Sequence, residues 1–324
     1  MNGLRLSGAA ADASRVTLLS GPTPVHELSR LRDALAAEGN GRCPRLVVKR
    51  DDAIAFGFGG NKVRKLEFAI AEALAAGADT VVTLGGLQSN HARATAAAAA
   101  KLGLHCVLIL NGEPPAKAAA NTLLDQLLGA EIEYIPSRAE RAEARDRVME
   151  RLRREGRAAF FVPLGASTPV GALGFMAAVD EMVEQEVRPD VIVHAGSSGG
   201  TQAGLVAGIT RRALGTRVIA VSADDPADAI AATVGGIVRG IAGLEAFEGT
   251  IEVDDTRVGG GYGVATQASR EAQQLAARTE ALFVDHTYTA KALGALIAYV
   301  REGRFSSDQT VLFWHTGGQV GLFA

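Results

Sequence analysis

The fold and function predicted for this chain depend on one stretch, Gly59-Gly60-Asn61-Lys62-Val63-Arg64-Lys65-Leu66-Glu67. Its two glycines permit a close backbone approach, and the helix expected from Lys62 offers free N–H groups to an anion. Lys62 would lie at the positive end of the helix dipole, which lowers the cost of losing its proton. The stretch therefore predicts an anion site beside an activated lysine. Taken alone, it also fits an ordinary solvated lysine at a helix start.

The composition indicates a globular protein that acts on small molecules. The 324 residues, 48% of them hydrophobic, are enough for two lobes or one large α/β unit. The 33 basic and 36 acidic residues give a net charge of −3. No long run of one sign occurs outside a single helix, so we expect neither a nucleic acid nor a membrane as partner.

The cysteines and the N-terminus bear on localisation. Cys43 and Cys106 form no Cys-X-X-Cys pair, which fits a reducing compartment without a disulfide framework. The segment from Met1 to Arg15 has no long apolar run, and no segment approaches the roughly 18 apolar residues of a membrane span. We therefore expect a cytoplasmic protein with neither signal nor anchor.

Strand and helix patterns alternate along the chain, which predicts parallel sheets covered by helices on both faces. Neither a repeat nor a low-complexity linker is present, so any two lobes should pack against each other. The predicted strands are Leu46 to Arg50, Thr80 to Leu84, His105 to Leu110, Ile132 to Ile135, Val191 to His194, Arg217 to Val221 and Val311 to Trp314. The predicted helices include Val25 to Glu38, Lys62 to Ala76, Ser89 to Leu102, a helix with Leu123, Leu124, Leu127 and Leu128 on one face, Arg138 to Glu155 with a capping box of Ser137 and Glu140, and Thr201 to Ala213.

Three further glycine-rich turns follow predicted strands: Gly85 to His91, Gly196 to Thr201, and Thr316-Gly317-Gly318. Ligands bind at the carboxyl ends of strands in open parallel sheets, which would let these turns share one cleft. The Gly196 to Thr201 turn offers consecutive N–H groups and two hydroxyls at a helix start, which suits a phosphate without a metal. It lacks the Gly-Lys-Ser/Thr ending of a nucleoside triphosphate site, and any one turn alone is equally consistent with a plain loop.

Two other chemistries compete for these residues. The segment Gly196-Ser197-Ser198-Gly199-Gly200 matches the Gly-x-Ser-x-Gly nucleophile elbow of α/β-hydrolases. A downstream Asp254 or Asp285 followed by His286 or His315 would supply the serine, acid, histidine order. The hydrolase interpretation leaves the other glycine-rich turns unexplained. A metal site is not expected, because the six histidines are scattered and no Cys/His cluster has ligand spacing.

A lysine at one glycine-rich turn, a Ser-Asn-His at another and a metal-free phosphate cup at a third are what a pyridoxal phosphate lyase needs. Six motifs occur in order along the chain: Lys49-Arg50-Asp51-Asp52, the stretch Gly59 to Glu67, Gln88-Ser89-Asn90-His91, Gly261-Tyr262-Gly263-Val264, Tyr288-Thr289-x-Lys291 and His315-Thr316-Gly317-Gly318. With these motifs the sequence resembles the D-cysteine desulfhydrase and 1-aminocyclopropane-1-carboxylate deaminase family from about Arg50 to the C-terminus.

The resemblance implies a set of residues that bind pyridoxal 5'-phosphate. Lys62 would be the Schiff-base lysine, and Asn90 would hydrogen-bond the ring hydroxyl. The remaining cofactor-binding positions are the phosphate cup of Ser198, Gly199, Gly200 and Thr201, helped by Lys65, and two residues beside the ring, Thr289 and Thr316.

The same resemblance implies the residues that handle the substrate. Ser89 would hold the substrate carboxylate or assist proton transfer, while Asn90 and His91 would lie against the substrate. Tyr262 and Tyr288 would flank it, and Lys62 or a nearby tyrosine would remove the α-proton. Lys62, Ser89, Tyr262 and Tyr288 are therefore the expected catalytic residues.

By this resemblance the fold is α/β, a tryptophan-synthase-β-like (fold type II) enzyme with two packed lobes, each with a mainly parallel sheet covered by helices. The larger, cofactor-binding lobe would comprise residues 1–58 and 176–324, and the smaller lobe residues 59–175. Family members usually pair as homodimers, so a homodimer is expected.

The expected activity is β-elimination from a small amino acid, most directly D-cysteine to pyruvate, ammonia and sulfide. The deaminase branch has a glutamate where this chain has Thr289 and a leucine where it has Thr316, which favours the desulfhydrase branch. Ala265-Thr266, Ala290 and the tail Gln319 to Gly321 depart from the desulfhydrase pattern. Cysteate sulfo-lyase, the cyclopropane deaminase and a non-catalytic relative therefore stay open as alternatives.

Overall fold

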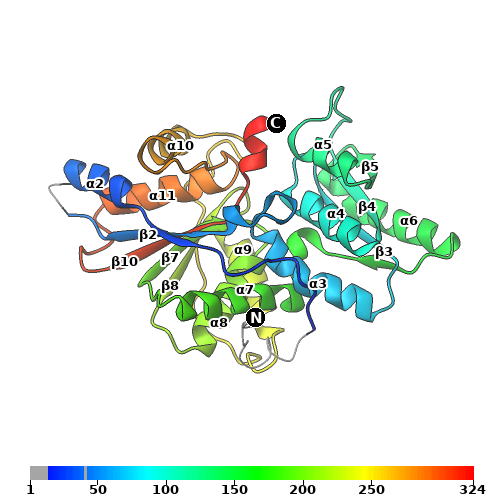
Figure 1. Cartoon of the computed structure of the whole chain (residues 1–324), viewed down its shortest axis with the longest axis horizontal. Coiled ribbons are helices and arrows are strands. Elements are labelled where there is room, and N and C mark those ends of the chain that lie inside the picture. The colour runs from blue at the N-terminus through cyan, green and yellow to red at the C-terminus, as the bar shows by residue number, and fades with distance from the viewer. Residues whose placement is uncertain (1–13, 40–41) are drawn as a thin grey trace.

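The apolar strands form two separate sheets in the computed structural model, which describes residues 14–39 and 42–324 (Figure 1). The larger sheet has the order β1-β2-β10-β7-β8-β9, and only its β1–β2 pair is antiparallel. Its central strand β7 is buried along its whole length, as expected where helices cover both faces. The strand bounds are β1 Val25–Glu27, β2 Arg45–Arg50, β7 Val191–Gly196, β8 Arg217–Ser222, β9 Glu252–Asp254 and β10 Thr310–His315.

The smaller sheet has the order β5-β4-β3-β6 and is entirely parallel. Its strands are β3 Thr80–Gly86, β4 His105–Asn111, β5 Glu131–Ile135 and β6 Ala159–Phe161. All four strands fall inside the range 59–175 expected for the smaller lobe. The predicted fold class is confirmed, whereas the lobe boundaries at residues 58 and 175 stay a prediction.

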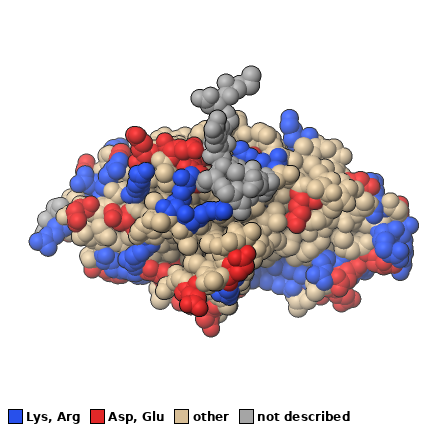
Figure 2. Space-filling view, turned by 90° about the horizontal axis from the view of Figure 1, so that it is seen from below, with Lys and Arg blue, Asp and Glu red and all other residues tan. Residues whose placement is uncertain are grey.

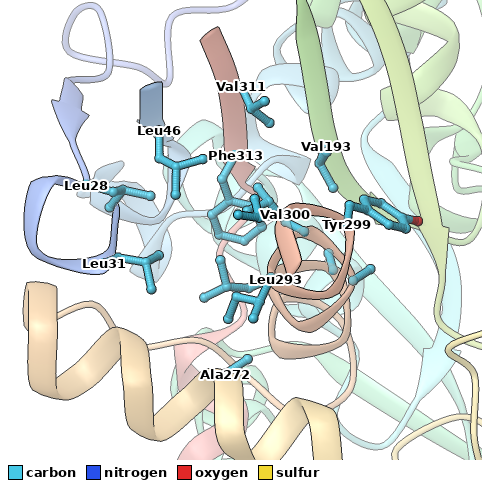
Figure 3. Packing of buried hydrophobic residues seen from close by; sticks show 14 of the residues in the cluster. Leu28, Leu31, Leu46, Val193, Ala272, Leu293, Tyr299, Val300, Val311 and Phe313 are labelled. Carbon is cyan, nitrogen blue, oxygen red and sulfur yellow. The ribbon is translucent and has the colours of Figure 1, made fainter. Parts of the chain in front are cut away.

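Two helical layers enclose the larger sheet (Figure 1). Helices α2 (Ser29–Glu38), α10 (Gln267–Glu280) and α11 (Thr289–Arg301) pack on one face. Helices α7 (Pro169–Glu184), α8 (Gly200–Arg211) and α9 (Ala227–Arg239) pack on the other. Successive strand residues point to opposite faces, so Phe313 belongs to the first core and Trp314 to the second. Figure 3 shows Phe313 lying beside Leu293 and Val300 of α11.

The smaller sheet is covered by α3 (Lys62–Ala75) and α4 (Asn90–Leu102) on one face and by α6 (Arg141–Arg154) on the other. Helix α3 also packs on α7, which belongs to the larger core. A Cβ on Gly174 of α7 would lie 2.2 Å from the Arg64 carbonyl, so only glycine allows this approach. Helix α5 (Ala120–Leu127) and short 3-10 turns at Asp51–Ala53, Phe56–Phe58, Arg138–Glu140, Leu164–Ala166 and Gln319–Phe323 complete the described elements.

A buried ionic cluster joins α3 to the larger sheet and to α7. Arg64 Nε donates to Asp51 Oδ1 at 2.9 Å, and its NH1 donates to Glu181 Oε2 at 2.9 Å. Lys49 Nζ donates to Glu181 Oε1 at 2.5 Å, and Trp314 Nε1 donates to Asp51 Oδ2 at 2.8 Å. Burial disfavours the Glu181 carboxylate, but Arg64 and Lys49 outweigh burial and lower its pKa to about 2. The cluster therefore persists as a charged, hydrogen-bonded unit.

Two predicted helix starts were wrong. Val25 to Glu27 forms a strand antiparallel to β2, and the helix begins only at Ser29. The segment Val25-His26-Glu27 pairs with the edge of the sheet at β2, and this contact overrides its helical pattern. Residues Arg138 to Glu140 form a 3-10 turn, and α6 starts at Arg141. The Ser137 hydroxyl donates to the Glu140 carboxylate instead of forming the predicted capping box with the backbone.

In helix α5 a polar face is buried, and leucines of the predicted leucine face are exposed. Leu123 and Leu127 are 43% and 74% exposed. The polar residues Asn121 and Asp125 face inward and are fully buried. Asn121 accepts a hydrogen bond from Arg93 and donates to Asn90, so polar contacts with α4 orient α5.

The surface has no extensive patch of one charge on the face shown in Figure 2, where positive and negative side chains are mixed. None of the described helices has the length and apolar content to cross a membrane. The segment from Met1 to Arg15, expected to carry no signal, lies almost wholly outside the described residues.

The ionic cluster gives a stability prediction. Arg64→Met leaves two carboxylates buried without their main cation, so we expect a loss of about 3–5 kcal/mol in the free energy of unfolding. Arg153→Met is the matched control, because Arg153 lies on the outer face of α6 and, among the described residues, forms an ion pair with Glu150 alone. Urea unfolding followed by circular dichroism measures both variants, and equal effects would contradict the assigned role of the cluster.

Candidate active site

The stretch Gly59 to Glu67 and the glycine-rich turns meet around the N-terminus of α3. Gly59 and Gly60 have φ values of +69° and +95°, and a Cβ on Gly59 would lie 2.4 Å from the Ile54 carbonyl. The Asn61 backbone N–H donates to the Thr316 carbonyl at 3.0 Å. Asn61 Nδ2 donates to Thr201 Oγ1 at 2.9 Å. Asn61 therefore ties the start of α3 to the residue after β10 and to the start of α8.

Two adjoining cavities open at this junction. The first encloses about 480 Å³, counting its open mouth, and the second about 1040 Å³. Residues from all of the glycine-rich segments line them, which confirms one shared cleft. The residues common to both cavities are Lys62, Asn90, Ser197, Ser198 and Tyr288.

Lys62 lies where the two cavities meet, and its Nζ donates to Asn61 Oδ1 at 2.9 Å. Burial lowers the pKa of Lys62 to about 8, helped by the positive charge of Arg93 and opposed by Asp285. Arg64, two residues further along α3, does not supply this charge, because it is engaged in the ionic cluster. Arg93 of α4 supplies the neighbouring positive charge, although no sequence motif indicated it.

The turn between β7 and α8 forms the expected cup at the first cavity. Gly199 has a φ of +81°, and a Cβ on Gly200 would lie 2.9 Å from Ser167 Cα. Ser198, Gly199 and Thr201 line the cavity, with backbone N–H groups at the start of a helix. Ser167 Oγ donates to Ser198 Oγ at 2.9 Å and so holds the outer side of the turn. The N–H groups and hydroxyls that this turn presents to the cavity fit a phosphate group.

Lys65 and His194 lie behind this cup. Lys65 is 1% exposed, and its Nζ is 3.5 Å from Ser167 Oγ, so it reaches the cup through Ser167. Burial, together with the charge of Lys62, lowers the pKa of Lys65 well below its ordinary value. His194 lines the first cavity, and its Nε2 lacks a hydrogen-bond partner among the described residues. Burial lowers the pKa of His194 to about 4, so the ring is neutral.

Asn90 and Ser89 begin α4 beside Lys62. Ser89 is the N-cap and its Oγ accepts from the Ala92 N–H at 3.1 Å. Asn90 Oδ1 accepts from Asn121 Nδ2 at 3.1 Å, which leaves the Asn90 NH₂ group to donate to a ligand. Sequence reasoning missed Asn121, which orients Asn90 from α5.

His91 is held below the second cavity, which it lines. The Thr83 hydroxyl donates to the Val162 carbonyl at 2.7 Å, so its oxygen accepts from His91 Nε2 at 2.8 Å. Burial lowers the pKa of His91 well below its ordinary value, with the charges of Lys65 and Lys62 acting in the same direction. His91 is therefore a neutral imidazole with a proton on Nε2.

Tyr262 and Tyr288 form a hydroxyl pair at the second cavity. Their hydroxyl oxygens are 2.6 Å apart, and the rings meet edge to face with centroids 5.6 Å apart. Burial raises the pKa of both phenols, and that of Tyr288 lies well above its ordinary value. Both tyrosines are therefore protonated near neutral pH and can donate hydrogen bonds.

The two predicted threonines have different surroundings. Thr316 lines the first cavity. Thr289 is fully buried and is absent from the lining of both cavities. Its hydroxyl donates to Asp285 Oδ1 at 2.7 Å. Asp285 also accepts the N–H of Tyr288 at 2.9 Å, so this carboxylate fixes the start of α11.

The arrangement that a serine hydrolase needs is not assembled. The Ser198 hydroxyl has Ser167 as its side-chain partner. His315 is bound to the Phe283 carbonyl and to the Gly317 N–H. Asp254 accepts hydrogen bonds from Thr256 and Tyr299. None of these contacts joins a serine to a histidine and an acid, so the geometry does not support that alternative.

Comparison with known proteins identifies the family of this chain. The family model described as "Pyridoxal-phosphate dependent enzyme" matches residues 16–317. D-cysteine desulfhydrases of Salmonella typhi and Salmonella newport (strain SL254) are both 37% identical over 322 residues. Each alignment covers 96% of this chain and 95% of the relative.

Solved structures agree with the fold. An ACC deaminase homologue superposes with a TM-score of 0.88 at 33% identity, covering 97% of this chain and 94% of the other. Threonine deaminase isoform 2 from Solanum lycopersicum has a TM-score of 0.65 at 17% identity, covering 91% and 79% of the two chains. The second match shows likeness of fold alone.

The pKa of Lys62 gives a pH prediction for the ligand-free protein. The neutral amine is the nucleophile, so labelling of Lys62 by acetic anhydride should rise with pH through a midpoint at about 8. Peptide mass spectrometry after brief labelling gives the fraction modified at each pH. A midpoint at the ordinary lysine value of 10.5 would contradict the electrostatic environment described for Lys62.

Proposed function

The chain belongs to the pyridoxal-phosphate dependent enzyme family, with the type II fold of that family, and from this premise we propose that it eliminates the β-substituent of a small amino acid, D-cysteine in the first place. When bound, pyridoxal 5'-phosphate supplies an electron-withdrawing ring that stabilises negative charge at the substrate Cα. The relatives named D-cysteine desulfhydrase support this substrate, since they match over nearly the whole chain.

We assign the first cavity to the cofactor. Lys62 would hold the cofactor aldehyde covalently, because its lowered pKa supplies a neutral amine. Ser198, with the backbone of Gly199, Gly200 and Thr201, would bind the phosphate. The Asn90 NH₂ group would donate to the ring hydroxyl. Lys65 would support the phosphate from behind the cup, and Thr316 would lie beside the ring. Thr289, which lines neither cavity, would act only by holding Asp285.

The second cavity, on the other side of Lys62, would hold the amino acid. Ser89 and the neighbouring N–H groups of α4 would bind the α-carboxylate, with Asn90 and His91 against the substrate. Lys62 is the better base for the α-proton, because Tyr262 and Tyr288 have raised pKa values and stay protonated.

The hydroxyl pair is then placed to serve the departing group. As the Cβ–S bond breaks, sulfur leaves with the bonding electrons and gains a proton, which Tyr262 or Tyr288 can donate. Hydrolysis of the released product gives pyruvate and ammonia. Neutral His91 beside the pocket donates its Nε2 proton to Thr83, so its Nδ1 can accept a hydrogen bond without adding a charge.

The observation that carries this proposal is the position of one depressed-pKa lysine at the junction of a phosphate cup and a polar pocket. We expect the purified enzyme to release pyruvate and sulfide from D-cysteine. Lys62→Ala should reduce kcat by at least about 10³-fold, because a covalent and proton-transfer group is lost. Lys101→Ala, on the exposed side of α4, is the control. Full activity of Lys62→Ala would contradict the proposal.

A second candidate substrate has an anionic β-substituent, such as the sulfonate of cysteate. Arg138 and Arg141 both line the second cavity. Asp224 forms an ion pair with Arg138 at 2.6 Å. Within residues 14–39 and 42–324, Arg141 donates only to the neutral Asn111 Oδ1, which lies 3.0 Å from its Nε. No carboxylate of the described residues forms an ion pair with Arg141. Arg141 is therefore a cation of this pocket that is free to bind a substrate anion, although Asp225 also lines the cavity.

Arg141→Gln separates the two substrates. If Arg141 binds an anionic substituent, kcat/KM for cysteate should fall about 10- to 100-fold, which is the value of one charge-assisted hydrogen bond. The value for D-cysteine should change little. Arg145→Gln, one helical turn further along α6, is the matched control. Absence of sulfite release by the wild-type enzyme would rule out the second candidate.

We also propose a cytoplasmic homodimer with the lobe boundaries given above. The free, buried Cys43 and Cys106 are consistent with a reducing compartment. Exposed Leu123 and Leu127 of α5 lie near the C-terminal turn Gln319–Phe323, which exposes Phe323. Such adjacent apolar residues favour contact with a second copy, and sedimentation measurements would show it.

A further inference from the structure

Lys291 is a motif residue for which the proposed reaction has no use. It lies on α11, three residues after Tyr288, and is 2% exposed. Its ammonium donates to three backbone carbonyls: Ala223 at 3.1 Å, Val258 at 2.8 Å and Gly261 at 2.8 Å. An ammonium group has three N–H donors, so each donor has one carbonyl acceptor.

The three carbonyls belong to two segments distant in sequence. Ala223 directly follows β8, and its N–H donates to the Gly196 carbonyl at 3.1 Å. Val258 and Gly261 belong to the loop between β9 and α10. This loop has positive φ at Gly259, Gly261 and Gly263, of +66°, +105° and +76°. Such a backbone has no regular ladder of hydrogen bonds, and Lys291 ties it to the end of β8.

The bound carbonyls lie next to two residues of the second cavity. Ala223 precedes Asp224, and Gly261 precedes Tyr262. The Tyr262 N–H donates to Asp224 Oδ1 at 3.2 Å, and the Tyr262 hydroxyl lies 2.6 Å from that of Tyr288. A shift of the loop would therefore move Tyr262 away from its hydroxyl partner.

We propose that Lys291 is a positioning residue whose ammonium acts as a built-in monovalent cation, holding the 258–261 loop against β8 so that Tyr262 faces the reacting group. Three neutral carbonyl oxygens in one shell are the ligands that potassium and ammonium ions prefer. Burial lowers the pKa of Lys291, while the negative charges of Asp224 and Asp285 oppose that shift. These carboxylates supply the counter-charge without touching the ammonium.

The inference goes beyond the proposed reaction and does not depend on the substrate. If the Lys291 ammonium acts as a cation, removal of the Lys291 side chain should open a site that a free monovalent cation can fill. Stability of the holoenzyme, measured without substrate, therefore tests it even if the assignment of D-cysteine fails. Turnover of whichever β-substituted amino acid the enzyme accepts gives the second readout.

The test is Lys291→Ala holoenzyme in matched concentrations of potassium, ammonium or tetramethylammonium chloride. In the bulky tetramethylammonium salt we expect the variant to have a lower thermal midpoint than the wild-type enzyme. We also expect its kcat to be lower by about tenfold or more, because a displacement of about 1 Å at a reacting group has an effect of this size. Potassium or ammonium should restore both quantities at least in part. The wild-type enzyme should respond equally to the three salts.

Lys291→Met is the matched control, because its side chain fills the space and leaves the three carbonyls without a donor. It should lose activity in every salt and gain nothing from potassium or ammonium. Wild-type activity of Lys291→Ala in tetramethylammonium, or a loss that neither small cation reverses in folded protein, would overturn the proposal. If Lys291→Ala does not fold in any salt, Lys291→Gln decides, since its amide can donate to two carbonyls. Activity of Lys291→Gln no higher than that of Lys291→Met would then overturn the proposal.

Discussion

The buried pairing of Arg64 with Asp51 and Glu181 is the interaction on which the geometry of the site depends. It fixes α3 between the two sheets, with Asp51 at the end of β2 and Glu181 on α7. Residues advance by 100° around an α-helix, so Lys62 and Arg64 project about 200° apart. Because Arg64 is anchored in the protein interior, Lys62 must face the opposite side, where the two cavities meet.

Electrostatics of the site follow from the same placement. Lys62, Lys65 and Arg93 all have pKa values lowered chiefly by burial. Asp285 acts on Lys62 from a distance, and its oxygens are already used to fix the start of α11. The protein thus gathers basic and donor groups without equal negative charge around Lys62. An anionic ligand would complete this balance, which agrees with the family's use of pyridoxal phosphate.

Several parts of the account could be predicted from the sequence because they are local. The strand and helix alternation gave the fold class, and the glycine-rich segments marked the cleft. Contacts between distant segments could not be predicted in this way. Arg93 shifts the pKa of Lys62 because α4 packs beside α3, and Arg141 enters the second cavity from α6. The orientation of α5 is a further example. Its leucine pattern does not indicate that Asn121 faces inward, because the polar partners that bind Asn121 are on α4.

The most direct test of the central claim is to find which lysine holds the cofactor. Lys62 and Lys65 are both buried amines with lowered pKa values, but Lys62 alone of the two lines the cavities. Borohydride reduction of the purified holoenzyme, followed by digestion and mass spectrometry, fixes the cofactor where it is attached. The account predicts a phosphopyridoxyl group on Lys62. The same group on Lys65, or none on either lysine, would contradict it.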